Sequence, residues 1–316
     1  GGMLSRSERL ARAVRWACET EVRAPKPGNV SVHAPGHGMT ADDFLMSAAA
    51  IAVPITAPGD TVGGRILAAV RATRAVAECN TNLGIVLLAA PLVHAALLAG
   101  PGRLRAALQE VLAALTVDDA DQAYQAIRLA APGGLGASPR HDVSEPPRVT
   151  LLAAMQEAAH RDSIARQYAT GYRDVFETGV PLARDCRSRW GSDEWAAVAV
   201  YLDLLTRIPD TLIARKFGLP AAQQVSREAA PLAQGLALAQ KPEHLSRQML
   251  EFDSRLKQAG LNPGTTADLT VASLLALRVE EILEAEVTDG GPAPGARGLT
   301  SWDGSRAFSQ LTEKET

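Results

Sequence analysis

The chain has 316 residues, of which 47% are hydrophobic but only 4% are aromatic, and its formal net charge is −3. A chain of this length buries enough surface to fold without a metal or disulfide staple, and its Ala- and Leu-rich composition favours packed helices over a β-sandwich. The small acidic excess argues against broad binding of nucleic acid or of an anionic membrane, because both need a basic surface.

Two further features of the sequence bear on where the protein works. The cysteines Cys18, Cys79 and Cys186 are widely spaced and form no Cys-x-x-Cys pair, which predicts reduced thiols in the cytoplasm. The most apolar run, residues 83–99, is short for a bilayer and is interrupted by Pro91 and His94. We therefore expect a buried helix there, with no membrane span.

Periodic apolar residues predict the helices in chain order. A first helix is expected to end near residue 20, and the two prolines of Pro25-Lys26-Pro27-Gly28-Asn29 then predict a loop as far as residue 38. Thr40, with Asp43 three residues on, predicts an N-cap for a helix over 41–53. Further helices are predicted over residues 61–78, 82–98, 102–115, 118–130, 150–176, 192–207, 211–217, 221–239, 243–259 and 266–287.

No alternating strand pattern and no internal repeat is visible. We therefore expect an all-α fold, a single globular multi-helix bundle over residues 4–287 around a polar central cavity. The Pro- and Gly-rich connection 131–147 is long enough to be either functional or disordered. Residues 288–316 are rich in Gly, Pro, Ser and charged residues, which predicts a disordered C-terminal tail.

Three aspartates lie on apolar stripes of predicted helices, namely Asp162, Asp203 and Asp268. An ionised carboxylate that faces a core costs several kcal/mol unless a cation, a metal or hydrogen-bond donors meet it. Together the three predict a polar cavity inside the bundle. Taken singly, Asp162 has a simpler interpretation as the partner of a nearby arginine, and Asp268 as a helix cap.

Cations and donors on the loops would complement these carboxylates. Lys26 between two prolines suits a phosphate contact, or is a solvated lysine in a proline turn. Arg215 and Lys216 suit a phosphate as well, or stabilise the C-terminal end of their helix. The segment 262–266 leads into the last predicted helix, whose N-terminal N–H groups would hold an anion.

A metal-dependent phosphohydrolase of the helical HD type is one alternative. His37, His141-Asp142 and Asp210 imitate the order of its metal ligands. That chemistry needs the His-Asp pair on a helix, however, whereas His141-Asp142 lies in a Pro-rich loop. A non-catalytic helical binding protein is the other alternative.

Four motifs in order resemble one family, the triphosphoribosyl-dephospho-CoA synthases. They span residues 21 to about 276 and read Glu21 with Pro25-Lys26-Pro27-Gly28-Asn29, Asn80-Thr81-Asn82-Leu83-Gly84, Asp210-Thr211 with Arg215, and Asn262-Pro263-Gly264 with Ala267-Asp268-Leu269. The resemblance implies an all-helical transferase that uses ATP as the ribosyl donor. An acceptor hydroxyl would attack the anomeric carbon and expel adenine, and the triphosphate would stay on the ribose.

That chemistry requires cations and Mg²⁺ at the triphosphate and a carboxylate that takes the acceptor proton. We accordingly expect Asp210 and Asp268 to bind Mg²⁺. The catalytic candidates are Glu21, Asp43, Asp142 and Asp162. The candidates for binding the nucleotide are Lys26, Asn29, Asn82, Arg215 and Lys216.

The chain also departs from the family pattern. Thr265-Thr266 replaces a Gly-Ser pair, and the stretches 133–142 and 161–165 resemble a divergent branch associated with one-carbon metabolism. The acceptor is therefore expected to be dephospho-CoA or a precursor of tetrahydromethanopterin, a cofactor with an α-ribosyl link. Small nucleotide and cofactor-precursor substrates are the expected partners, and the Ala-rich surface would permit a homodimer.

Overall fold

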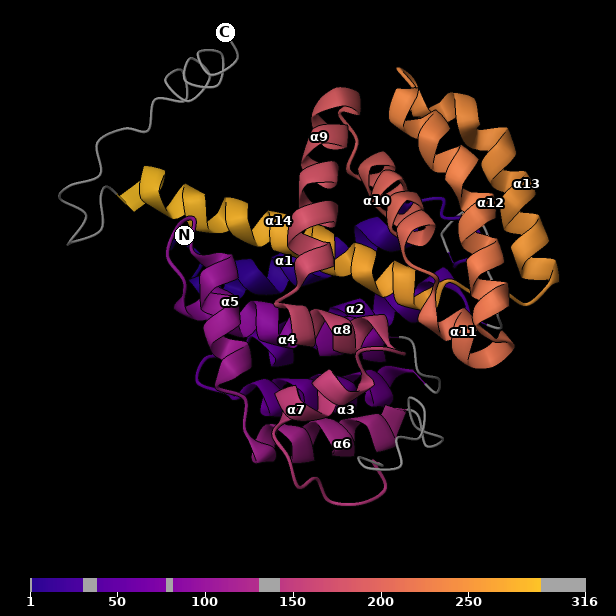
Figure 1. The fold of residues 1–316 in the computed structure, drawn as a ribbon. Helices are drawn as coiled ribbons and strands as arrows, with labels where there is room; N and C mark the ends of the chain where they lie inside the picture. Colours follow the sequence, from indigo (N-terminus) through magenta and orange to yellow (C-terminus); the bar gives the residue numbers. More distant parts are fainter. Residues whose placement is uncertain (1, 31–38, 78–81, 131–142, 291–316) are drawn as a thin grey trace, which may run out of the picture.

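A computed structural model of the chain describes residues 2–30, 39–77, 82–130 and 143–290, and every regular element in these ranges is helical (Figure 1). The all-α fold class predicted from the sequence is confirmed. The elements are α1 (Arg6–Arg23), α2 (Ala41–Thr56), α3 (Val62–Val76), α4 (Leu83–Leu98), α5 (Leu104–Ala113), α6 (Val117–Ala130), α7 (Leu151–Ala158), α8 (Ser163–Thr170), the π-helix η1 (Val175–Gly179), α9 (Val180–Trp190), α10 (Asp193–Arg207), α11 (Thr211–Phe217), α12 (Leu219–Leu238), the 3₁₀-helix η2 (Pro242–Leu245), α13 (Ser246–Gln258) and α14 (Gly264–Gly290).

The long helix α14 crosses the molecule and organises the other helices around it (Figure 1). It packs against α1, α4, α9 and α10, and its residues from Leu269 to Leu277 are all buried. Because apolar residues occupy most of its circumference, neighbours are needed on several sides. Helices α9, α10, α12 and α13 lie on one side of α14, and α3, α6 and α7 lie on the other.

Helix α4 is the predicted buried helix. Nearly all its residues are buried, although Pro91 removes one backbone N–H inside it. The hydroxyls of Tyr168 and Tyr172 donate to the carbonyl oxygens of Leu87 and Leu88, at 2.5 and 2.7 Å. These bonds fasten α8 and the segment after it to α4. Within the described ranges, no helix combines the length and apolarity needed to cross a bilayer.

The single long helix predicted over 150–176 is wrong. The chain breaks after α7, and Asp162 caps α8 by accepting hydrogen bonds from the N–H groups of Ile164 and Ala165. Gly171 and Tyr172 then adopt positive φ angles of 64° and 60°, which end α8 before η1 and α9 begin. An aspartate that caps a helix start competes with helix continuation, so the apolar periodicity across residue 162 was misleading.

The other helices lie near their predicted ranges, with ends that differ by a few residues. Helix α9 was not predicted at all, because Arg184, Asp185, Arg187 and Arg189 obscure its apolar periodicity. Helix α14 continues to Gly290, three residues beyond the predicted domain end, and residues 291–316, where the tail was predicted, lie outside the described ranges. The division into a domain over 4–287 and a tail stays a prediction.

Candidate active site

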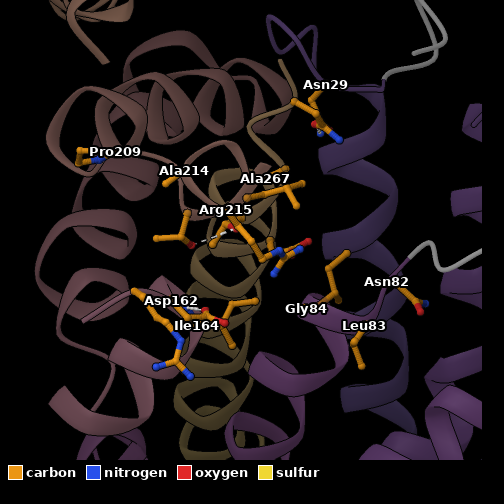
Figure 2. Close-up of a pocket in the computed structure, with 18 of the residues that line it drawn as sticks. Asn29, Asn82, Leu83, Gly84, Asp162, Ile164, Pro209, Ala214, Arg215 and Ala267 are labelled. Atoms are coloured by element: carbon orange, nitrogen blue, oxygen red, sulfur yellow. Dashed lines mark hydrogen bonds between the residues drawn. The ribbon is translucent and has the colours of Figure 1, made fainter. Parts of the chain in front are cut away.

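One cavity of about 470 Å³ opens where several helices begin. The N-terminal ends of α4, α8, α11 and α14 surround it together with the C-terminal end of α1 and the start of α2. Figure 2 shows Asn82 and Gly84 on one side of it, Pro209 and Ala214 on the other, and Asp162 below. Its lining residues are Glu21, Asn29, Met39, Phe44, Asn82, Leu83, Gly84, Ile85, His160, Arg161, Asp162, Ile164, Pro209, Thr211, Leu212, Ala214, Arg215, Leu219, Asn262, Gly264, Thr265, Ala267 and Asp268.

Helix starts around a shared cavity make it attractive to an anion. The first N–H groups of a helix carry partial positive charge and have no partner inside the helix. Here α4, α8, α11 and α14 all place first-turn residues in the lining. The anion site predicted at the start of the last helix stays a prediction, and the dipoles of the four helix starts together favour a polyanion such as a phosphate chain in this cavity.

Hydrogen bonds fasten three of these helix starts to one another. The hydroxyl of Thr211 accepts from the N–H of Ser163 at 3.2 Å and donates to Thr265 Oγ1 at 3.3 Å. Asp210 Oδ1 accepts from the N–H groups of Leu212 and Ile213, while its Oδ2 accepts from the N–H and the hydroxyl of Thr266 at 2.8 Å. The cavity wall formed by α8, α11 and α14 is therefore rigid.

These contacts overturn the placement expected for Asp210 as a metal ligand. The residue is 1% exposed, is absent from the lining, and each carboxylate oxygen already accepts two hydrogen bonds. Burial raises its pKa, and the hydrogen bonds from α11 and Thr266 oppose that rise. Asp210 joins two helices and has no oxygen left for a cation in the cavity.

Among the carboxylates that line the cavity, Asp268 has no partner in the described part of the chain. It lies in the first turns of α14 and lines the cavity, and no described residue donates a hydrogen bond to it. Burial, followed by the negative charges of Glu21, Asp210 and Asp162, raises its pKa well above the usual range. Such a group binds a cation or exchanges a proton when a ligand arrives.

Gly84 makes room for this carboxylate. A β-carbon placed on Gly84 would lie 2.0 Å from Oδ2 of Asp268 and 2.8 Å from Cδ1 of Ile164. Any side chain at position 84 would therefore push Asp268 aside. The Gly of the Asn-Thr-x-x-Gly motif and the Asp of the Ala-Asp-Leu motif meet at this point.

Glu21 is the second carboxylate of the cavity, and it corrects the prediction for Lys26. Glu21 is 4% exposed and lines the cavity, whereas Lys26 is absent from the lining. Nζ of Lys26 lies 2.9 Å from Oε1 of Glu21. Burial raises the pKa of Glu21, and the ammonium of Lys26 opposes that rise. Lys26 is thus neither solvated nor presented to a phosphate, because it forms a buried ion pair.

Asp162 shares the cavity with two arginines. Burial raises its pKa, while the N–H groups of Ile164 and Ala165 and the charges of Arg215 and Arg161 lower it. Arg215 comes from α11 and Arg161 from the residue before the α8 cap, so two cations from separate elements line one wall. Of the three aspartates expected to share one cavity, Asp162 and Asp268 line it together with Arg215, and Asp203 does not.

Other predicted residues lie elsewhere. Asp203 pairs with Arg207 at 2.7 Å on α10 and lines no part of the cavity, which contradicts its predicted place inside it. Asp43 accepts from the N–H of Thr40 at 2.9 Å, so its carboxylate completes the predicted cap of α2 and is absent from the lining. Lys216 is exposed and outside the lining. Asp142, with His37 and His141, lies outside the described residues.

The two asparagines assigned to the nucleotide do line the cavity. Asn29 Nδ2 donates to Oδ1 of Asn262 at 2.9 Å, which joins the first loop to the start of α14. Asn82 is 5% exposed, and its Oδ1 accepts from Thr73 at 3.0 Å. Its Nδ2 is buried without a partner among the described residues. This amide is a donor available to a ligand.

Several lining residues escaped the sequence interpretation. In the sequence, Arg161 stands out only as part of a divergent stretch, and nothing assigns His160, Phe44 or Leu219 to a site, although all four line the cavity. Arg161 and Asp162 directly precede a helix start, a position that favours anion contacts, but the predicted long helix hid that start. Phe44 and Leu219 are single apolar residues near helix starts, and no sequence signal distinguishes them from core residues.

Comparisons with known proteins agree with the motifs. A profile of the ATP:dephospho-CoA triphosphoribosyl transferase family matches residues 7–287, most of the chain. The chain belongs to this family. A Pseudomonas fluorescens protein named as a probable 2-(5''-triphosphoribosyl)-3'-dephosphocoenzyme-A synthase is 30% identical over 113 residues, which are 35% of this chain and 37% of that protein. The match thus spans little more than a third of the length of that relative.

A solved structure from Archaeoglobus fulgidus has the same fold. It is a candidate triphosphoribosyl-dephospho-CoA synthase, 25% identical, and it superposes with a TM-score of 0.61. The superposition covers 76% of this chain and 98% of the archaeal one. The fold of this triphosphoribosyl transferase family member is thus shared over nearly the whole archaeal protein.

Proposed function

We propose that this family member transfers the triphosphoribosyl group of ATP to an acceptor hydroxyl and releases adenine. Its family supports the reaction class. The observation that carries the proposal is the cavity itself, where four helix starts and two arginines suit a triphosphate and the unpartnered Asp268 lies beside them. The two arginines line the cavity together with three carboxylates, Glu21, Asp162 and Asp268, a combination that suits a polyanion bound together with a cation.

The proposed reaction balances without a further reactant. The oxygen of the acceptor hydroxyl forms a bond to C1′ of the ribose, and the bond from C1′ to N9 of adenine breaks. The hydroxyl proton goes to a carboxylate, and adenine takes up a proton as it leaves. Glu21 and Asp268 are the lining carboxylates suited to this proton transfer and to stabilising positive charge on the ribose.

The residues of the cavity fit one Mg²⁺ ion held jointly with the nucleotide. Mg²⁺ usually takes one or two carboxylates together with phosphate oxygens, and Asp268 is the lining carboxylate with neither an ion pair nor a hydrogen bond among the described residues. When bound, the ion would neutralise charge on the triphosphate. Asp210 is not part of this proposal, since its oxygens are occupied.

The identity of the acceptor is a separate part of the proposal. The family description supports dephospho-CoA. The departures from the family motifs at residues 161–165, which include the cavity residues Arg161 and Asp162, support a ribitol-bearing precursor of tetrahydromethanopterin as the alternative. Both acceptors offer a hydroxyl to C1′, so the donor chemistry is the same for each.

Incubation with ATP and Mg²⁺ tests the reaction class, with each acceptor supplied in turn. We expect free adenine, in amounts equal to a triphosphorylated product, with one of the two acceptors. Release of ADP, AMP or inorganic phosphate in place of adenine would contradict the proposal and would favour the phosphohydrolase alternative. Adenine chromatography and product mass spectrometry distinguish these results directly.

Arg215 is proposed to contact the triphosphate, so its replacement should act on ATP binding. Arg215→Met is expected to raise the KM for ATP by roughly 10- to 100-fold, because a hydrogen bond to a charged group contributes about 1.5–3 kcal/mol. The adjacent Lys216→Met removes the same charge outside the cavity and should change KM by less than about threefold. Steady-state kinetics at saturating acceptor give both values, and equal effects of the two substitutions would contradict the assignment.

A further inference from the structure

The wall behind Glu21 contains a fully buried ammonium group. The Lys26 side chain is 0% exposed. Its Nζ forms an ion pair with Oε1 of Glu21 at 2.9 Å and donates hydrogen bonds to the carbonyl oxygens of Glu21, Ala24 and Val30, at 2.6, 3.2 and 3.4 Å. An ammonium has three protons, so these partners leave it no donor for a triphosphate.

The loop that carries Lys26 is held from both sides. The hydroxyl of Tyr201 donates to the carbonyl oxygen of Pro27 at 2.5 Å, and Oδ1 of Asp253 accepts from the N–H of Gly28 at 2.8 Å. Gly28 has a φ of 83°, and a β-carbon there would lie 2.7 Å from Leu256 Cδ1. These contacts hold the loop in place, and the Lys26 side chain is fully buried within it.

We propose that Lys26 is a positioning residue, which keeps Glu21 ionised at the cavity wall so that Glu21 takes the proton of the acceptor hydroxyl. This inference rests on the proposed function. As the acceptor oxygen bonds to C1′, its proton moves to a carboxylate oxygen of Glu21, and the electrons of the broken C1′–N9 bond leave with adenine, which takes its own proton. Lys26 touches none of the reacting atoms.

The physical reason lies in the cost of burying a charge. A carboxylate as buried as Glu21 becomes neutral unless a cation stands beside it, and a neutral carboxyl group accepts no proton. Lys26 supplies that cation and, through its bonds to the Glu21 and Ala24 carbonyl oxygens, also holds the last turn of α1 in place. The proline-flanked lysine of the first motif thus acts on catalysis through Glu21.

Four forms of the full chain test this inference: the wild type, Glu21→Gln, Lys26→Met and the double variant. Lys26→Met alone leaves a buried unpaired carboxylate and is expected to fold poorly, whereas the double variant removes both charges and folds. We expect Glu21→Gln to lower kcat by roughly 10²-fold or more. The double variant should match Glu21→Gln within about threefold, in kcat and in the Kd for ATP measured by calorimetry.

The competing assignment, in which Lys26 binds the triphosphate, gives different numbers. A Kd for ATP weaker by about tenfold or more in the double variant than in Glu21→Gln would overturn the inference. So would a Glu21→Gln variant that turns over at the wild-type rate. Lys241→Met removes a charge from an exposed position outside the cavity and serves as the control, with unchanged kcat and Kd expected.

The same measurements separate this inference from the proposed function. If the wild type binds ATP but releases no adenine with either acceptor, the proposed reaction fails. In that case, a Kd for ATP that is the same in the double variant as in Glu21→Gln still shows that Lys26 does not contact the triphosphate. If the wild type does not bind ATP, both fail together.

Discussion

Replacing Asp268 with asparagine is expected to lower adenine release by roughly 10³-fold while leaving the fold intact. Asparagine keeps the size of the side chain but offers neither a negative charge nor a proton acceptor of comparable strength. Since no described residue donates a hydrogen bond to Asp268, the substitution breaks no such bond in the ligand-free protein. Full activity in this variant would remove Asp268 from the mechanism.

The same variant should be more stable than the wild type when no nucleotide or Mg²⁺ is present. The folded-state pKa of Asp268 is raised, so between the unfolded value of about 4 and the folded value the native state binds more protons. Wild-type stability therefore falls as pH rises through the folded pKa. We expect an advantage for Asp268→Asn of about 1–3 kcal/mol at neutral pH.

Denaturant unfolding at several pH values measures this advantage. It should be small near pH 4 and should grow as pH rises to neutral, because only the wild type loses a proton in that interval. An advantage that is constant with pH, or one that shrinks, would show that burial and neighbouring carboxylates do not raise the pKa of the partly buried Asp268. A carboxylate that reduces stability where it is needed for function is a common feature of active sites.

Gly84→Ala is expected to lower kcat by roughly 10²-fold without unfolding the chain. The added methyl group would lie 2.0 Å from Asp268 Oδ2 and therefore displaces that carboxylate. A misplacement of about 1 Å at a reacting group costs about 10²-fold. Alanine also favours a helix over glycine by up to about 1 kcal/mol, so stability should change little.

Gly100→Ala is the matched control for this substitution. A β-carbon at Gly100 meets no atom within 4 Å, and its φ is not positive. Its kcat should stay at the wild-type value. Equal kcat for Gly84→Ala and Gly100→Ala would show that the position of Asp268 does not limit turnover.

Much of the fold was predictable because apolar periodicity dominates an all-helical chain. The ends of α11 were predicted to the residue, and the capping box of α2 was predicted from Thr40 and Asp43. The helix over 150–176 was wrong because the stripe continues in phase across the break at Asp162. A cap and a core-facing carboxylate look alike in a sequence, and only the backbone geometry separates them.

The candidate site was partly predictable, because the motifs identify the segments that build the cavity. Asp268, Glu21 and Arg215 do line it. Asp210 and Lys26 belong to the same motifs but lie one layer behind, where Asp210 joins α11 to α14 and Lys26 neutralises Glu21. A motif identifies the residue type at a position. It does not tell whether that side chain contacts the ligand or supports another side chain that contacts it.

Asp210 and Thr211 show how hydrogen bonds between helix starts hold the cavity wall in place. The two residues tie together the starts of α8, α11 and α14, whose first turns line one cavity. Dipoles fixed before the ligand arrives need no reorganisation when charge develops. The proposed anion site would therefore depend first on these fixed helix starts, and the two arginines would add to it.

A structure of the protein with ATP and Mg²⁺, without acceptor, would show where the nucleotide binds. We expect the triphosphate at the starts of α8, α11 and α14, with phosphate oxygens within about 3.2 Å of Arg215 and with C1′ of the ribose facing Glu21 and Asp268. A nucleotide bound outside this cavity, or one with adenine at the helix starts and the phosphates in solvent, would contradict this expectation.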